Sequence, residues 1–375
     1  MSVAVVGLAV SAAGAAGAYT SHPGAVPAKA ASWKWTKGVK LPDVKASSVV
    51  SGLSCPSTKL CVATATISTS GAHGNNGVWW TTNPLAKKPK WHYERINAQK
   101  NGGQTLYFIS GAISCNVAGS HDECAIASGG NIWQTSNPTK GWGGAAIDTY
   151  LLEGEACWVN VHCLSSDDQG YILTTEGATV LGSAQPILPP SGSDLGTALG
   201  CAPYRSGRNP FCVEVAGNSQ IAYSTDPASG TWHAGKVHGA AEIDEVSCAT
   251  NTLCVFSEDL GGAEPVVGVS SAPKGGESWI KTVKQFAVPE SVAGFVGGVT
   301  AVDCNRDSLC LASGNGAKGN FVLVSTRPTA KFSSWKSYKL NDGKDSDSGA
   351  GGIACPTDKF CLIVSQEGRV VQGRR

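Results

Sequence analysis

Charge and methionine are scarce in this chain of 375 residues, which has one Met and only 15% charged residues. The formal net charge of +1 gives no overall attraction to nucleic acid or to a membrane surface. Beyond the N-terminus, no segment approaches the roughly 20 apolar residues that a membrane-spanning helix needs. We therefore expect no nucleic-acid partner, and no membrane span once the N-terminal segment is removed.

Catalytic sequence motifs are absent as well. The chain contains neither a G-x-S-x-G nucleophile elbow nor the H-E-x-x-H zinc motif. The six His residues that follow the N-terminal segment lie at unlike positions in the repeats described below. We therefore expect a protein that is not an enzyme and that uses no cofactor.

The N-terminal segment has the features of an export signal. Residues Val3 to Ala18 are apolar or small, and Ala28-Lys29-Ala30 offers an A-x-A-like cleavage site. We interpret residues 1–31 as a signal peptide and linker, which predicts a secreted, extracellular protein. A weakly hydrophobic membrane anchor is the alternative. Export also suits the 14 Cys residues, because disulfides persist in oxidising compartments.

The Cys residues mark an internal repeat with a mean period of 50 residues. The segments SCPSTKLCVAT at Ser54 and SCATNTLCVFS at Ser247 illustrate the repeated unit. Each predicts a strand ending at the first Cys, a polar turn and a second strand opening at the second Cys. A Gly-rich loop, a third strand such as GVWWTT at Gly77 and a Trp-led fourth strand follow. Four strands in such a period are typical of propeller blades, so residues 32–375 are predicted to form an all-β, seven-bladed β-propeller.

Ring closure supports this number of blades. The seventh unit ends after its third strand, near Gly368 to Gln372, and lacks a Trp-led outer strand. A spare one, from Trp33 to Leu41, precedes the first Cys pair. We predict that this N-terminal strand completes the last blade and leaves no open sheet edge. The third unit, which has no Trp between Thr179 and Pro186, is degenerate and marks a specialised side of the ring.

Each unit is predicted to contain one disulfide, because opposed residues on antiparallel strands lie within disulfide reach. Fourteen thiols at these spacings fit zinc sites poorly, so no metal is expected. The predicted disulfides are Cys55–Cys61, Cys115–Cys124, Cys157–Cys163, Cys201–Cys212, Cys248–Cys254, Cys304–Cys310 and Cys355–Cys361.

The repeated unit, as in CPSTKLCVA at Cys55, resembles secreted actinobacterial seven-bladed propellers. The turn from Ser224 to Trp232 loosely resembles the Asp-box of sialidase-like propellers. The chain is also similar to the propeller lectin subunits of Streptomyces umbrella toxin particles. That resemblance covers nearly the whole chain after Trp33, and it implies a non-catalytic, lectin-like subunit that docks a protein partner. The shared motif residues are structural, so it carries over no binding residue.

The Trp residues have two interpretations. Those that open the outer strands recur once per blade, which favours packing between blades over sugar stacking; they are Trp91, Trp142, Trp232, Trp279 and Trp335. Trp158 differs, because it follows Cys157 in a turn where other blades carry Pro, Asn or Ala. We regard it as a candidate for ligand binding.

The candidate binding site lies on one face of the predicted ring. The turns between strands 1–2 and 3–4 emerge on one side, the hairpin face; the longer loops emerge on the other, the loop-rich face. Sorting the charges predicts an acidic loop-rich face that attracts a cationic partner, unless the charges are simply solvated. Long loops on a rigid scaffold concentrate binding residues. Besides Trp158, the candidates are His73, Asn75, Asn76, Tyr107, Phe108, Asp167, Asp168, Glu242, Asp244, Asp259, Phe295, Asp345 and Asp347.

Two weaker possibilities remain on the same face. The segment Asp342 to Gly349 has some of the spacing of a Ca²⁺ loop but lacks the later bidentate Glu. Adjacent acids, Asp167 with Asp168 and Asp244 with Glu245, could support glycoside hydrolysis. Our hypothesis is a secreted, non-catalytic recognition module that binds a cell-surface glycan, docks a protein partner in an extracellular assembly such as an antibacterial toxin, or does both. The alternative is a propeller glycoside hydrolase or lyase acting on extracellular polysaccharide.

Overall fold

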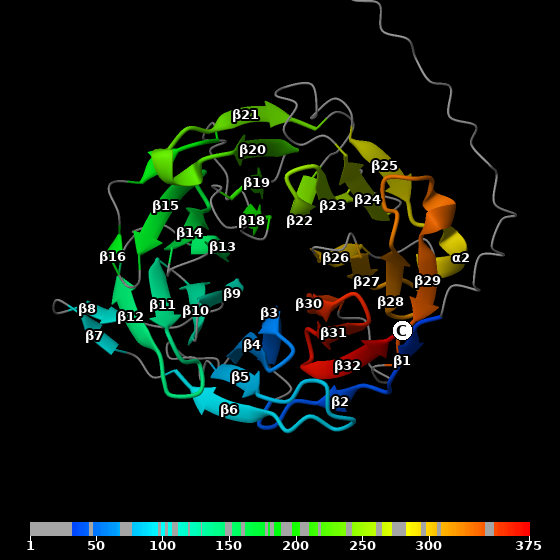
Figure 1. Ribbon diagram of the computed structural model, residues 1–375, viewed down its shortest axis with the longest axis horizontal. Coiled ribbons are helices and arrows are strands. Elements are labelled where there is room, and N and C mark those ends of the chain that lie inside the picture. Colours follow the sequence, from blue (N-terminus) through cyan, green and yellow to red (C-terminus); the bar gives the residue numbers. More distant parts are fainter. Residues whose placement is uncertain are drawn as a thin grey trace, which may run out of the picture. The chain divides into compact units, whose positions relative to one another are not determined.

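A computed structural model describes most of the chain from residue 32 onward (Figure 1). The described residues are 32–44, 48–67, 77–96, 99–101, 104–106, 112–118, 121–128, 130–146, 152–158, 162–176, 179–180, 184–188, 197–202, 210–216, 219–237, 242–259, 265–271, 283–293, 298–305, 309–341 and 349–375. Residues Trp33–Arg375 form one compact unit.

Seven antiparallel sheets are arranged around a central axis, with the first Cys strand of each sheet innermost (Figure 1). This confirms the predicted all-β, seven-bladed β-propeller. The blades follow one another along the chain, because each fourth strand leads into the innermost strand of the next sheet.

The first four blades contain the following strands. Blade 1 contains β3 (Ser48–Ser57), β4 (Leu60–Ile67), β5 (Gly77–Thr81) and β6 (His92–Arg95). Blade 2 contains β9 (Ile113–Ala118), β10 (His121–Ser128), β11 (Asn131–Thr135) and β12 (Gly143–Ala146). Blade 3 contains β13 (Leu152–Trp158), β14 (His162–Asp167), β15 (Tyr171–Glu176), β16 (Thr179–Val180) and β17 (Gln185–Pro186). Blade 4 contains β18 (Thr197–Cys201), β19 (Cys212–Ala216), β20 (Gln220–Ser224) and β21 (His233–Lys236).

The remaining blades complete the ring. Blade 5 contains β22 (Glu242–Thr250), β23 (Leu253–Asp259), β24 (Pro265–Ser270) and β25 (Lys284–Ala287). Blade 6 contains β26 (Val299–Cys304), β27 (Cys310–Gly314), β28 (Phe321–Ser325) and β29 (Lys336–Lys339). Blade 7 contains β30 (Ala350–Thr357), β31 (Phe360–Ser365) and β32 (Arg369–Arg374), with β1 (Lys34–Trp35) and β2 (Val39–Lys40) from the N-terminal side.

A few short elements lie between the blades. β7 (Gln99–Asn101) and β8 (Gln104–Leu106) pair as a separate hairpin between blades 1 and 2. Two 3₁₀ turns, Pro227–Ser229 and Phe332–Ser334, precede outer strands, and α2 (Glu290–Ala293) connects blades 5 and 6. None of the described helices has the length and apolar character needed to cross a membrane.

The N-terminal strand closes the ring as predicted. β1 and β2 both pair antiparallel with β32, and Lys34 lies opposite Arg374. Trp35 lies against Gly373, where a Cβ atom would be only 2.4 Å from the indole ring. Glycine at this position therefore lets the N-terminal Trp cover the last strand. Because the two ends of the unit share one sheet, β32 is paired on both sides and is not an edge strand.

All seven predicted disulfides form, each joining the first and second strands of one blade at Cα–Cα distances of 4.0–4.1 Å. The blades themselves meet through seven apolar clusters, one at each junction. Trp142 and Trp335 are buried in these clusters, and Trp91 and Trp232 pack against them. These four therefore have the predicted packing role, whereas Trp279 lies outside the described residues.

Blade 3 is irregular, as its sequence predicted. Its outer strand is divided into the two-residue pieces β16 and β17, which pair separately with β15.

Candidate functional site at the channel mouth

A cavity of about 510 Å³ lies where the innermost strands of all seven blades reach their Cys residues. It opens on the hairpin face, because the turns between the first and second strands follow directly. The sequence analysis placed the candidate site on the opposite, loop-rich face. The polar side chains of the wall are Ser54, Ser114, Asn116, Ser247, Asp303, Asn305 and Thr357.

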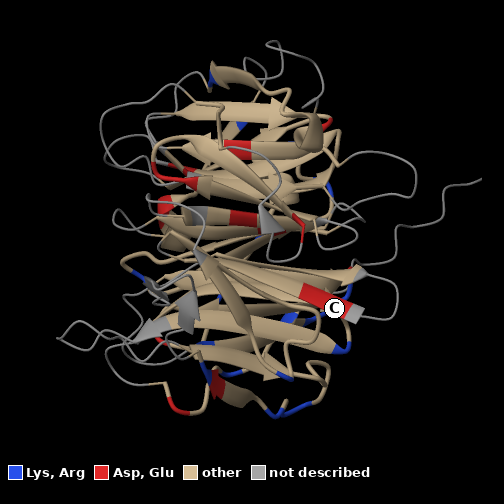
Figure 2. Ribbon diagram, turned by 90° about the vertical axis from the view of Figure 1, so that its left-hand side faces the viewer, with Lys and Arg blue, Asp and Glu red and all other residues tan. Residues whose placement is uncertain are grey.

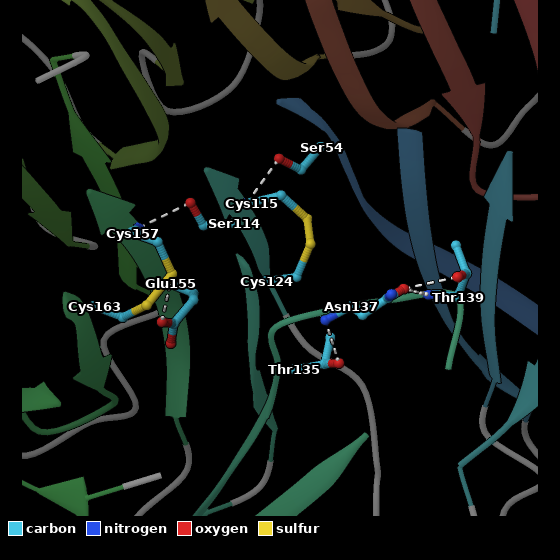
Figure 3. Close-up of a disulfide and its surroundings, with 10 residues drawn as sticks. All are labelled: Ser54, Ser114, Cys115, Cys124, Thr135, Asn137, Thr139, Glu155, Cys157 and Cys163. Carbon is cyan, nitrogen blue, oxygen red and sulfur yellow. Dashed lines mark hydrogen bonds between the residues drawn. A yellow bond between two sulfur atoms is a disulfide. The ribbon is translucent and has the colours of Figure 1, made fainter. Parts of the chain in front are cut away.

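The residue before the first Cys of a blade connects that blade to the next (Figure 3). The Ser54 hydroxyl accepts a hydrogen bond of 3.0 Å from the backbone N–H of Cys115. The Ser114 hydroxyl accepts one of 2.9 Å from Cys157 N–H. Each bond joins innermost strands that share no ladder, so these serines fix the position of neighbouring blades at the cavity wall.

The same connection occurs on the other side of the ring. Ser247 accepts from Cys304 N–H at 2.9 Å, and the Asp303 carboxylate accepts from Cys355 N–H at 2.8 Å. At the three remaining junctions this position holds Ala156, Gly200 or Ala354, which have no side-chain acceptor. A Cβ atom at Gly200 would lie 2.7 Å from the Val246 carbonyl oxygen, so blade 5 approaches too closely there for a side chain.

Asp303 is the one carboxyl group in the described wall of the cavity. Burial raises its pKa to about 6, although hydrogen bonds from Cys355 N–H, the Ser247 hydroxyl and Cys304 N–H oppose that rise. Asp303 is therefore mostly ionised at pH 7 and can accept hydrogen bonds from a ligand. The wall can thus donate and accept hydrogen bonds around a single negative charge.

Asn116 adds an unused donor to the wall. Its amide nitrogen is buried and has no hydrogen-bond partner among the described residues. Buried polar groups are normally paired, so such an amide indicates a place for a ligand oxygen or a water molecule.

Two predicted site residues, Asp167 and Asp168, lie inside the molecule. They follow one another at the end of β14, with exposed fractions of 0% and 6%. One carboxylate oxygen of Asp167 accepts from Gln169 N–H at 2.9 Å and Tyr171 N–H at 2.8 Å. Asp167 therefore stabilises the turn into β15. The pair of adjacent acids had suggested a position on the surface, and that expectation is wrong.

Three other predicted residues do come together, at the loop-rich end of blade 5. Glu242 and Asp259 are register partners on β22 and β23, and the exposed Asp244 lies at the adjoining bulge. Burial, together with the charge of Asp244, raises the pKa of Glu245 to about 8.

Trp158 ends β13 opposite His162, so its backbone belongs to the strand and not to the predicted turn. The candidates outside the described residues are His73, Asn75, Asn76, Tyr107, Phe108, Phe295, Asp345 and Asp347.

The sequence analysis did not predict the burial of three glutamates, one each in blades 3, 4 and 5. Burial raises the pKa of Glu155 to about 8, while the Ser165 hydroxyl donates to it at 2.6 Å. Burial and the charge of Asp167 raise the pKa of Glu214 well above its usual value. Burial raises the pKa of Glu258 to about 7, although Gln285 donates to it at 2.6 Å. A Glu within an otherwise apolar strand was the available signal for Glu214.

Glu155 also lies beside a disulfide, with its Oε1 atom 3.7 Å from Cys157 Sγ (Figure 3). Glu155, Cys157 and Cys163 are the one group in the described chain whose ligand atoms are close enough to share a metal ion. Because the two sulfurs are bonded to each other, they offer no thiolate to a metal.

Charge divides between two sides of the ring. Residues 97–288 contain 18 Asp and Glu but eight Lys and Arg, whereas residues 33–96 and 289–375 contain ten and 20. The acidic side is blades 2–5 and the basic side is blades 6, 7 and 1. In Figure 2, blades 4 and 5 lie in the upper part and blades 7 and 1 in the lower part, where most of the blue ribbon is found. The sequence analysis sought a division between faces and missed this one, which counting charges by blade would have found.

Comparison with known proteins adds support for the fold. No protein-family model matches the chain, and no curated protein matches it. A catalytically inactive virginiamycin B lyase from Staphylococcus aureus, solved with quinupristin, is 12% identical, with a TM-score of 0.62 over 92% of this chain and all of that one. YCF48 bound to D1 peptide is 13% identical, with a TM-score of 0.58 over 92% of this chain and 97% of that one. The WD40 propeller domain of Doa1 is 6% identical, with a TM-score of 0.59 over 91% and 97%. At such identities the likeness concerns the fold alone.

Proposed function

We propose that this protein is a secreted, non-catalytic recognition module that binds a glycan in the channel-mouth cavity. The composition of the cavity wall carries this proposal. In the described part of the wall, hydroxyl, amide and main-chain groups surround one carboxylate, Asp303. Such a wall suits the many hydroxyl groups of a sugar, each of which donates and accepts hydrogen bonds.

The size of the cavity is compatible with this ligand class. Small-molecule sites usually enclose about 300–1,000 Å³, and this cavity encloses about 510 Å³. A monosaccharide or disaccharide unit at the end of a longer glycan is of suitable size. Asp303 provides an acceptor that fixes its orientation.

The same wall argues against the alternative of a glycoside hydrolase. Most such enzymes use two carboxyl groups that flank the scissile bond. The described wall contains one, and its Cys residues are bonded to each other and cannot act as nucleophiles. The likeness to a lyase does not alter this argument, because it concerns the fold.

Secretion and assembly are parts of the proposal that rest on other observations. All 14 Cys residues form disulfides, which is typical of proteins from oxidising compartments. The resemblance of the repeats to propeller lectin subunits of umbrella toxin particles suggests that this protein also docks a protein partner. A propeller solved with a bound peptide, YCF48, illustrates that the fold is suited to such docking.

Glycan-array binding by oxidised protein of residues 32–375 tests the proposal, with Asp303→Asn and the matched control Asp358→Asn. Asp358 lies in the hairpin turn of blade 7 and outside the cavity wall. We expect the wild type and the control to bind the same glycan within twofold, and Asp303→Asn to bind at least tenfold more weakly. An asparagine oxygen can still accept from Cys355 N–H, so the fold should persist. Equal binding by all three proteins, or release of a cleaved product, would contradict the proposal.

A further inference from the structure

A second cavity, of about 430 Å³, lies at the outer strand of blade 6. The innermost strand, β26, is at the opposite edge of that sheet. Three segments form it: α2, the loop before β28, and the outer strand β29. Its polar wall consists of Ser291, Lys318, Asn320, Ser337, Tyr338 and Lys339. We call this cavity the blade 6 groove.

Two exposed lysines from different segments border the groove. Lys318 belongs to the loop before β28, and its ammonium group donates to the main-chain oxygen of Glu290 at 3.2 Å. Lys339 ends β29. Glu290 is the one carboxylate among the described residues of these three segments. The described residues of these segments therefore carry a net positive charge, with two ammonium groups and one exposed carboxylate.

More lysines continue the positive surface toward blade 7. Lys336 lies on the same strand as Lys339, and both are exposed. A bridge between Lys37 and Asn341 places the N-terminal strand segment, with the exposed Lys34, beside the end of β29. The described part of blades 6, 7 and 1 carries 17 Lys and Arg but six Asp and Glu. A polymer with repeated negative groups could therefore contact this surface over several units.

The neutral groups of the groove are held in place. The Tyr338 hydroxyl accepts from Trp33 N–H at 3.4 Å, and its ring packs at 6.4 Å from the Trp35 ring. Asn320 is 3% exposed. Tyr338 thus anchors β29 at the junction with blade 7, while the groove itself presents the Ser291 and Ser337 hydroxyl groups and the Asn320 amide beside two cations. This mixed surface differs from a plain patch of solvated lysines.

We propose that the blade 6 groove binds an acidic sugar unit of an extracellular polysaccharide. Lys318 and Lys339 pair with the carboxylate or sulfate of that unit, and Ser291 and Ser337 contact its hydroxylated ring. The lysines of β29 and β1 bind neighbouring anionic units of the same polymer. This site is separate from the channel-mouth cavity and does not depend on the function proposed for it.

Titration calorimetry with three oligosaccharides of similar length tests the proposal: a sulfated heparin fragment, a carboxylated polygalacturonate fragment and neutral dextran. The variant is Lys318→Gln with Lys339→Gln. The matched control is Lys140→Gln with Lys236→Gln, two exposed lysines in blades 2 and 4. At 50 mM NaCl we expect at least one acidic fragment to bind and dextran not to bind. The groove variant should lose at least tenfold in affinity, and the control should remain within twofold.

The two acidic fragments distinguish a sulfate from a carboxylate ligand, and either result supports the proposal. An equal loss in the control pair would overturn it, since binding would then reflect general charge. Failure of both acidic fragments to bind would also overturn it. So would a poly-glutamate peptide that binds as tightly and depends equally on Lys318 and Lys339, because the partner would then be an acidic protein. Asp303→Asn should leave the acidic-fragment affinity unchanged, which separates this site from the channel mouth.

Discussion

Blades 6, 7 and 1 differ from blades 3, 4 and 5, although the same repeat builds them all. Apolar packing differs little between them: the clusters at the junctions 6/7 and 7/1 contain 13 described residues each, and those at 3/4 and 4/5 contain nine and 12. The difference lies in buried carboxyl groups, because blades 3, 4 and 5 bury those of Glu155, Glu214 and Glu258. Burial favours the neutral, protonated form of these three carboxyl groups, while blades 6, 7 and 1 carry an excess of Lys and Arg.

This contrast shows which parts of the repeat are free to vary. Cys pairs, turns and strand lengths are shared, because they form the blade itself. Positions that face the neighbouring blade differ, since each junction needs only a surface that complements its partner. A ring of similar blades can therefore carry unlike sides, and a net charge of +1 conceals them.

The largest effect on stability is expected for a core residue of the basic side. Trp79 is fully buried between blades 7 and 1, and its indole N–H donates to the Pro42 carbonyl at 2.6 Å. We expect Trp79→Ala to lower the free energy of unfolding by about 3–5 kcal/mol, because it leaves a large cavity. Chemical denaturation measures this loss. The control is Trp80→Ala, since Trp80 is partly exposed and stacks on His92; an equal loss there would contradict the assignment of Trp79 to the core.

The next effect concerns pH and the acidic side. Because the pKa of Glu155 rises from 4.5 to about 8 on folding, the folded protein keeps a proton that the unfolded chain releases. Stability therefore falls as the pH rises from about 5 to about 8, by about 1.4 kcal/mol per pH unit for this group. Glu155→Gln should remove this contribution, or about 3 kcal/mol between pH 6 and pH 8.

Urea unfolding at pH 6, 7 and 8 checks the prediction. The control is Glu176→Gln, an exposed residue of the same blade, which should keep the wild-type slope. If Glu155→Gln retained that slope too, Glu155 would be ionised in the folded protein and the contrast between the two sides would weaken.

Disulfide removal compares the two sides directly. Cys55–Cys61 in blade 1 and Cys157–Cys163 in blade 3 both span six residues in sequence. Chain entropy predicts that either double Cys→Ala variant loses about 2 kcal/mol. Calorimetry of the two variants measures the difference. A much larger loss in blade 3 would show that packing around Glu155 outweighs the chain-entropy effect.

The smallest effect tests the contacts between innermost strands. Ser54→Ala removes the acceptor for Cys115 N–H and should cost about 1 kcal/mol. Ser57→Ala is the control, because Ser57 accepts only from Lys59 N–H within its own turn among the bonds described here. Thermal unfolding of both variants provides the measurement. A larger loss for Ser57→Ala would argue against a role of Ser54 in connecting the blades.

Fold and site were not equally predictable from sequence. The repeated Cys pairs indicated seven blades and their disulfides. The Trp-led strands indicated the closure, because the last unit lacks one and a spare one precedes the first unit at Trp33. Asp303 showed no such signal. It occupies the same position as Ser54, Ser114 and Ser247, and its place in the cavity wall follows from the convergence of seven strands. The sequence indicated a surface pair at Asp167 and Asp168, but both are buried, and the backbone N–H groups that bind Asp167 belong to the turn that follows it.

The sequence by itself determined the blade, its disulfide, the number of blades and the strand that closes the ring, since these depend on local patterns and their period. The sequence also contained the division of charge, because that division is between whole blades and can be counted along the chain. Only the tertiary structure decided which carboxyl groups are buried, where the channel mouth is polar and which lysines border a groove. The channel mouth, for example, is built where blades meet, and the residues that meet there are 43–61 positions apart in the chain.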